Sequence, residues 1–162
     1  MLETRVLDAI LDQHRRNPAN IVAILQDIQA KANWLPEEDL RYVCAELSIP
    51  LSKLMGLATF YRAFSLDPRG KHIVSVCLGT ACHVRGAERI VGAIERELGI
   101  KGGETDQDLQ WTLDTVNCLG ACALGPIVVV GGEYHGQMTS AKATRLVQKV
   151  KKAGENGAGQ DE

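Results

Sequence analysis

Residues 117–126 read NCLGACALGP, and residues 77–86 read CLGTACHVRG. Both segments are rich in glycine and alanine, and together they hold four of the five cysteines: Cys77 and Cys82, then Cys118 and Cys122. Four thiolates on two loops are the donor set of a tetrahedral sulfur site, which binds zinc or an iron–sulfur cluster. Small residues let the backbone approach an inorganic core and leave N–H groups free to donate to sulfur. We therefore take these two segments as the functional site.

The composition is that of an ordinary globular chain, and it narrows the classes of partner. The 162 residues are 45% apolar and 23% charged, with a formal net charge of −2, enough for one domain or two small ones. This balance does not favour nucleic acid or an anionic membrane surface as a partner. We expect neither a secretory signal nor a membrane span. An odd number of cysteines favours metal or redox chemistry in a reducing cytoplasm over disulfides.

The first 66 residues show helical periodicity. Apolar residues recur at intervals of three and four, and Asn17 followed by Pro18 is typical of a helix start. The pattern predicts four short helices, at residues 4–15, 18–32, 36–47 and 50–61. Joined by short loops, they predict a small helical bundle over residues 1–66. Cys44 falls on the apolar face of the third helix, so we expect it to pack in the core and not to bind metal.

After a turn at residues 67–70 the apolar pattern becomes strand-like. It predicts strands at residues 73–76, 111–116, 127–130 and 133–135. We expect a hairpin turn at Gly131 and Gly132, and helices at 90–98 and from 139 or 140 to 150.

The resulting order, β-α-β-β-β-α, indicates an α+β fold. We expect the helical bundle to be followed by a thioredoxin-like domain at residues 67–152, with the cysteine loops at strand ends. The segment 153–162, AGENGAGQDE, is polar and Gly-rich without an apolar anchor, so we expect a disordered tail.

The spacing of the cysteines leaves two chemistries open. Gaps of four and three residues lie within the range of zinc sites, but structural zinc usually replaces a missing core, and this chain has apolar residues enough to build one. Neither pair has the C-x-x-C spacing of a thiol–disulfide enzyme, and the plant-type ferredoxin order is absent. Spacing alone favours an iron–sulfur cluster over zinc and does not decide between them.

The residues around the cysteines resemble a known family. C-x4-C followed at a distance by C-L-G-A-C, together with GLATFY at residues 56–61, is similar to the thioredoxin-like 2Fe–2S subunit of respiratory NADH dehydrogenase, NAD-linked hydrogenases and formate dehydrogenases. The family more often has Val where Leu57 stands. The likeness runs from about residue 10 to residue 150. It implies one 2Fe–2S cluster with these metal ligands: Cys77, Cys82, Cys118 and Cys122.

The resemblance also implies a role in electron transfer. The chain would pass single electrons within a soluble NAD(P)-linked complex, beside a partner iron–sulfur flavoprotein that binds FMN and NAD(H), and with further redox subunits. It has no G-x-G-x-x-G motif, so we expect no catalytic residue and no nicotinamide site of its own. The segments GTACHVRGA and ALGPIVVV look most like subunits of hydrogenases, often electron-bifurcating ones. The alternatives are NADH:quinone oxidoreductase, NAD-dependent formate dehydrogenase, a free ferredoxin, or, in another class, a zinc-stapled interaction module.

The remaining candidates receive structural roles. His83 adjoins a ligand cysteine, and we expect it at the surface or hydrogen-bonded near the cluster. Four aromatic residues are expected in the core of the bundle: Trp34, Phe60, Tyr61 and Phe64. Four arginines are expected on a solvated face: Arg62, Arg69, Arg85 and Arg89.

Overall fold

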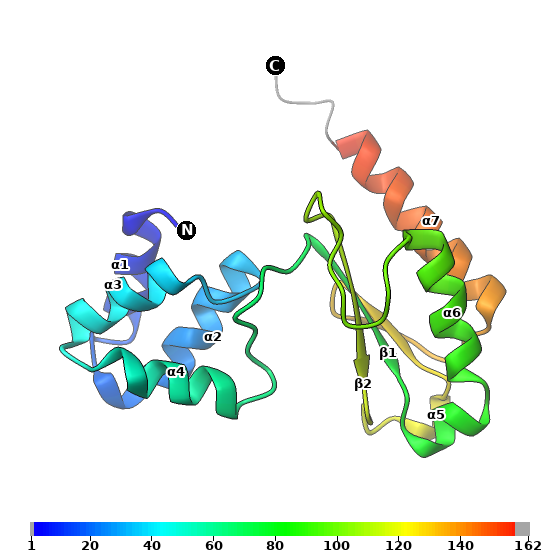
Figure 1. The fold of residues 1–162 in the computed structure, drawn as a ribbon, viewed down its shortest axis with the longest axis horizontal. Helices are drawn as coiled ribbons and strands as arrows, with labels where there is room; N and C mark the ends of the chain where they lie inside the picture. The colour runs from blue at the N-terminus through cyan, green and yellow to red at the C-terminus, as the bar shows by residue number, and fades with distance from the viewer. Residues whose placement is uncertain (1, 158–162) are drawn as a thin grey trace. The chain divides into compact units, whose positions relative to one another are not determined.

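The computed structural model describes residues 2–157 of the chain (Figure 1). The chain divides into two compact units, Met1–Arg69 and Gly70–Glu162. The division, between Arg69 and Gly70, falls within the turn that the sequence predicts at residues 67–70. Among the described residues no helix is both long and apolar enough to cross a bilayer.

The first unit is built from helices. They are α1 (Thr4–Gln13), the 3-10 turn η1 (Pro18–Asn20), α2 (Ile21–Ala32), α3 (Glu37–Leu47) and α4 (Leu51–Phe60). Asn17 is the N-cap of η1, which leads into α2, and its side chain accepts a hydrogen bond from the backbone N–H of Ala19 at 3.0 Å. Asn33 and Ser48 end α2 and α3 in the left-handed conformation. The helices predicted from periodicity are therefore present, with ends within a few residues of those expected.

The core of the first unit is a set of aliphatic side chains on the inner helix faces. Its fully buried members include Leu11, Ile24, Leu25, Ile28, Leu40, Val43 and Leu54. Cys44 is half-buried and packs against this core, as its place on the apolar face predicts. Burial raises the pKa of its thiol.

Of the four aromatic residues expected in this core, Phe64 alone is a buried member, and Trp34 is half-buried. Phe64 is buried, but Phe60 is 79% exposed, and Tyr61 is exposed as well. Leu54 and Ala58 mark the buried stripe of α4, and Phe60, the last residue of the helix, falls off that stripe. Its ring packs edge-on against Tyr61, with a centroid distance of 5.0 Å. The expectation of a core position is wrong for Phe60, which falls off the buried stripe, and for Tyr61, where the chain leaves the helix in an extended conformation.

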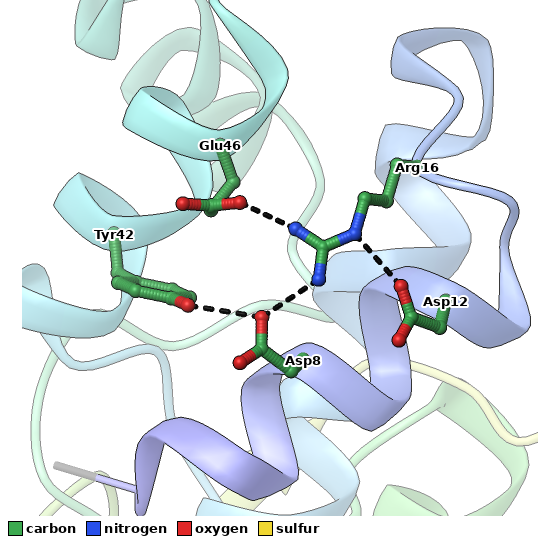
Figure 2. A network of polar contacts seen from close by, with 5 residues as sticks. All are labelled: Asp8, Asp12, Arg16, Tyr42 and Glu46. Atoms are coloured by element: carbon green, nitrogen blue, oxygen red, sulfur yellow. Dashed lines mark hydrogen bonds and ion pairs between the residues drawn. The ribbon is translucent and has the colours of Figure 1, made fainter.

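A polar network joins α1 to α3 in the same unit (Figure 2). Arg16 follows α1 and donates to Asp8 at 2.8 Å, to Asp12 at 2.7 Å, and to Glu46 on α3. Tyr42 of α3 donates to Asp8 at 2.9 Å. These bonds from Arg16 and Tyr42 lower the pKa of the Asp8 carboxyl, and Asp8 in turn raises the pKa of the Tyr42 hydroxyl.

The second unit contains a four-stranded mixed sheet. Its strands are β1 (His72–Cys77), β2 (Trp111–Val116), β3 (Val128–Val130) and β4 (Glu133–His135), in the order β2-β1-β3-β4. β1 and β2 are parallel, while β3 pairs antiparallel with both β1 and β4. The turn between β3 and β4 has positive φ at Gly131 and Gly132, as a tight hairpin requires. The predicted strands are all present.

Two helices, α6 (Ala87–Leu98) and α7 (Ser140–Gly157), lie side by side against this sheet (Figure 1). Their apolar faces share one core with the strands, which includes Val74, Val76, Ile90, Ile94, Leu113, Val128, Ala143 and Val147. α7 continues to Gly157, so residues 153–157 are helical and the prediction of a disordered tail fails there. The rest of that tail lies outside the described residues.

Candidate metal centre

The two cysteine loops meet because the strands that precede them are parallel neighbours. In the β1–β2 register Cys77 is opposite Val116, so both strands deliver their loops at the same edge of the sheet. The N–H of Leu78 donates to the carbonyl of Val116 at 2.7 Å and joins the two loops where they begin. Carboxyl ends of parallel strands are a usual place for a functional site, since loops from distant parts of the sequence converge there.

Cys77 and Cys82 form an inner pair of thiols. Cys77 is the last residue of β1, and its N–H donates to the carbonyl of Ile127 at 3.0 Å. Cys82 lies on α5 (Thr80–Val84), a short helix in a segment expected to be a loop. The two residues are 2% and 1% exposed. Burial, and then the hydrogen bond with Cys77, raise the pKa of the Cys82 thiol.

Cys118 and Cys122 form an outer pair that is exposed to solvent. Their Sγ atoms are 3.8 Å apart. Cys122 begins the 3-10 turn η2 (Cys122–Leu124), and the N–H of Gly120 donates to Cys118 Sγ at 3.3 Å. Gly120 has a φ of 80°, which aims its N–H at the sulfur and which residues with a side chain rarely adopt. The hydrogen bond with Cys118 raises the pKa of the Cys122 thiol.

Two glycines leave space for this arrangement. A Cβ at Gly79 would lie 2.4 Å from the carbonyl oxygen of Asn117, so any side chain there would push the two loops apart. A Cβ at Gly125 would lie 2.9 Å from Cys82 Sγ. The absence of a side chain thus lets the two loops pack closely at Gly79 and lets the outer loop approach an inner thiol at Gly125.

The donor set fits a two-iron cluster. The thiols are grouped two by two, and in a 2Fe–2S cluster held by four cysteines each iron takes two protein thiolates. Two sulfurs bound to one tetrahedral metal at about 2.3 Å are about 3.8 Å apart, which matches the outer pair. Within residues 2–157 no three His, Cys, Asp or Glu side chains gather as they would around one metal ion. The grouping of the thiols in two pairs is the one that a 2Fe–2S cluster requires.

The other sequence candidates are Cys44 and His83. Cys44 belongs to the helical unit. The imidazole of His83 is half-exposed, and its Nδ1 lies 3.7 Å from Glu88 Oε1. This agrees with the surface position expected for His83.

Arg85 is a site residue that the sequence does not reveal. It is expected on a solvated face, yet its Nη1 donates to the backbone carbonyls of Cys122 at 3.0 Å and Gly125 at 3.1 Å. The contact joins segments that are far apart in the sequence. No periodicity or motif spacing signals such a bond.

Comparison with known proteins assigns most of the chain to one family. The family described as thioredoxin-like 2Fe–2S ferredoxin matches residues 7–151. The chain is 36% identical over 128 residues to the HndA subunit of the NADP-reducing hydrogenase of Solidesulfovibrio fructosivorans, covering 79% of this chain and 75% of that subunit. It is 35% identical over 127 residues to a subunit of the NADH-quinone oxidoreductase of Rickettsia prowazekii, covering 77% of this chain and 72% of the relative.

Among solved structures, the fold is similar to part of an NAD+-reducing NiFe-hydrogenase in its air-oxidised state. The TM-score is 0.73 at 17% sequence identity, over 83% of this chain. The match spans 23% of the hydrogenase chain, so the likeness concerns the fold of that portion.

Proposed function

Because this chain belongs to the thioredoxin-like 2Fe–2S ferredoxin family, we propose that it is the electron-transfer subunit of an NAD(P)-linked oxidoreductase complex. The observation that carries the proposal is the pairing of four cysteines on two loops at one edge of the sheet. The chain contributes the passage of electrons, and the chemistry of substrates belongs to its partners.

The four cysteines have separate tasks in this proposal. Cys77 and Cys82, which are buried, would hold one iron of the cluster, and Cys118 and Cys122, which are exposed, would hold the other. The cluster supplies reversible uptake of one electron at a time. The sheet and α5 keep the inner thiols away from water, and the N–H of Gly120 donates to the sulfur of Cys118.

The exposed side of the centre is the surface that a redox partner can approach. Besides Cys118 and Cys122 it carries two exposed apolar side chains, Val84 (79% exposed) and Leu124 (54% exposed). Apolar side chains beside a redox centre suit contact with another protein, because the contact excludes water from the path between them. The partner we propose there is a flavoprotein subunit that binds FMN and NAD(H).

Hydrogenase is the first choice of complex, and electron bifurcation is proposed with it. The resemblance of GTACHVRGA and ALGPIVVV to hydrogenase subunits supports this choice, as does the 36% identity to the NADP-reducing hydrogenase subunit. NADH:quinone oxidoreductase is the second candidate, supported by 35% identity to the Rickettsia protein. Five free cysteines support a reducing compartment, and we propose the cytoplasm.

The first test is the anaerobic spectrum of the isolated full-length chain, with iron, sulfide and zinc assays. Two irons and two sulfides per chain, and an EPR signal that appears on reduction with dithionite, are expected. A colourless chain with one zinc, which also takes up no cluster from iron and sulfide, would overturn the proposal. Purification of the native complex, with assays for hydrogen-dependent and quinone-dependent turnover of NAD(P)H, then distinguishes the two candidate complexes.

A further inference from the structure

The side chain of Arg85 connects the two ligand loops. Arg85 directly follows α5, the helix that carries Cys82. Its Nη1 donates to the carbonyl oxygens of Cys122, the first residue of η2, and Gly125, the residue that follows η2 in the other loop. One guanidinium therefore ties the loop of the outer thiols to the helix of an inner thiol.

We propose that Arg85 is a positioning residue of the metal centre, which holds the outer ligand loop in place and whose positive charge raises the midpoint potential of the 2Fe–2S cluster. The inference rests on the proposed function in one respect, since it requires that the four cysteines hold this cluster. It goes beyond that function by assigning to a residue that is not a ligand an effect on both the lifetime and the potential of the cluster.

The need for a tether follows from the exposure of the outer loop. Its residues from Asn117 to Leu124 are exposed or half-buried, and η2 is closed by local backbone bonds, Leu124 N–H to Ala121 and Gly125 N–H to Cys122. Segments with few buried contacts open locally at low cost in free energy. A bond to a charged donor is stronger than a neutral one, so the two bonds of Arg85 oppose that opening.

The effect on potential follows from the place of the charge. The point where a Gly125 Cβ would stand is 2.9 Å from Cys82 Sγ and 3.6 Å from Arg85 Nη1, so the cation lies close to the thiols. Among the described residues Arg85 forms no ion pair with a carboxylate, so its charge is not neutralised locally. A cluster with four thiolates is negative, and reduction adds one electron. A nearby cation therefore stabilises the reduced state more than the oxidised state.

Arg89 provides a matched control. It lines the same cavity of about 380 Å³ as Arg85, together with Met138 and Ser140 at the start of α7. It is also exposed, but no hydrogen bond from its guanidinium to the ligand loops is found among the described residues. Arg89→Gln thus removes a positive charge from the same cavity and leaves the tether intact.

The experiment uses the full-length chain with its cluster, as wild type, Arg85→Gln, Arg85→Lys and Arg89→Gln. Midpoint potentials are measured by EPR-monitored titration with dithionite, and cluster release by the decay of visible absorbance in the presence of a chelator. We expect Arg85→Gln to lower the midpoint potential and to release the cluster about three- to tenfold faster, since two hydrogen bonds to a charged group are lost from a partly exposed site. The lowering should shrink at high ionic strength, because salt screens an exposed charge.

Two comparisons decide the outcome. Arg85→Lys keeps the charge but not the planar donor group, so its potential should stay near wild type while its cluster is released faster. Arg89→Gln should release its cluster at the wild-type rate, because both bonds of Arg85 remain. A midpoint potential in Arg85→Gln equal to that of wild type, or release as fast from Arg89→Gln as from Arg85→Gln, would overturn the inference.

If Arg85→Gln takes up no cluster, Arg85→Lys is compared with wild type: faster release supports the tether, and equal release overturns it. A wild-type chain that binds no cluster would instead refute the proposed function. The two failures are therefore distinguishable.

Discussion

The backbone of Gly125 packs directly on the sulfur of Cys82. A methyl group at Gly125 would lie 2.9 Å from that Sγ and 3.3 Å from the carbonyl oxygen of Cys122. The φ of Gly125 is −62°, which any residue adopts, so the restriction is one of space and not of backbone conformation. Gly125 is thus the point at which the outer loop presses on an inner ligand.

Gly125→Ala should therefore lower the cluster content of the chain. The added methyl group must displace either the sulfur or the turn that holds Cys122, and neither can move without disturbing ligand geometry. Iron and sulfide per chain, measured after anaerobic purification, report the effect.

Gly92→Ala is the control for this change. A Cβ at Gly92, within α6, would meet nothing within 4 Å. It should leave the iron content unchanged and stabilise the helix by about 0.5–1 kcal/mol, because alanine is the better helix former. An unchanged cluster in Gly125→Ala would show that the outer loop adapts to the extra group.

Cys118→Ser should abolish the cluster or make it severely unstable, because the outer iron loses one of its two thiolates. Cys44→Ser should keep a full cluster at some cost in stability, since Cys44 packs against the helical core. Visible absorbance and iron assays on the two variants test this difference. A normal iron content in Cys118→Ser would disprove its assignment as a ligand, and loss of colour in Cys44→Ser would disprove the packing role.

The Asp8–Arg16–Tyr42 network predicts a dependence of stability on pH. The pKa of Asp8 is lowered in the folded chain from its ordinary value of 3.8, first by the hydrogen bond from Arg16. Its contribution to stability is therefore fully present above that ordinary value and is lost as the pH falls through the folded pKa. Asp8→Asn should be less stable than wild type at neutral pH, and the difference should vanish in acid.

Urea unfolding followed by Trp34 fluorescence, in a Trp111→Phe background, measures this difference in the helical unit. Glu37→Gln is a suitable control, because Glu37 forms an exposed pair with Arg41 on the same helix. It should change stability less than Asp8→Asn does. A difference between Asp8→Asn and wild type that persists at low pH would show that shape, and not charge, accounts for it.

The two phenylalanines after residue 59 should respond differently to truncation. Phe64 is buried in the helical core, so Phe64→Ala should cost about 3 kcal/mol or more of the free energy of unfolding. Phe60 is exposed, and Phe60→Ser should stay within about 0.5 kcal/mol of wild type. Denaturant unfolding of the two variants checks the assignment, and equal losses would contradict the exposed position of Phe60.

Features that repeat along the chain were predictable from sequence. The apolar intervals of the helices, the strand before Cys77 and the Gly131–Gly132 hairpin all appear as expected. α5 was not predicted, because a helix of five residues is too short to show a period. Phe60 was misplaced because a residue at the end of a helix can leave the apolar stripe that its neighbours follow.

The candidate site also contains residues that the sequence predicts and a residue that it does not. The four cysteines can be identified in the sequence by residue type and spacing, and the parallel pairing of β1 with β2 explains why their loops meet. The bonds of Arg85 depend on where a long side chain points across 37 and 40 residues of sequence. Nothing local in HVRG distinguishes that arginine from one in solvent.

The unequal exposure of the four cysteines also determines the order in which their thiols oxidise in air before a cluster is inserted. Oxidants and alkylating reagents reach thiols that are open to water, so Cys118 and Cys122 should react before Cys77 and Cys82. With their sulfurs 3.8 Å apart, the outer two can be joined as a disulfide by an oxidant that takes two electrons, with release of two protons. Timed labelling with iodoacetamide would reveal that order. A chain closed in this way cannot accept iron until a reductant reopens it, so assembly of the centre depends on the thiol-reducing capacity of the cell as well as on its iron supply.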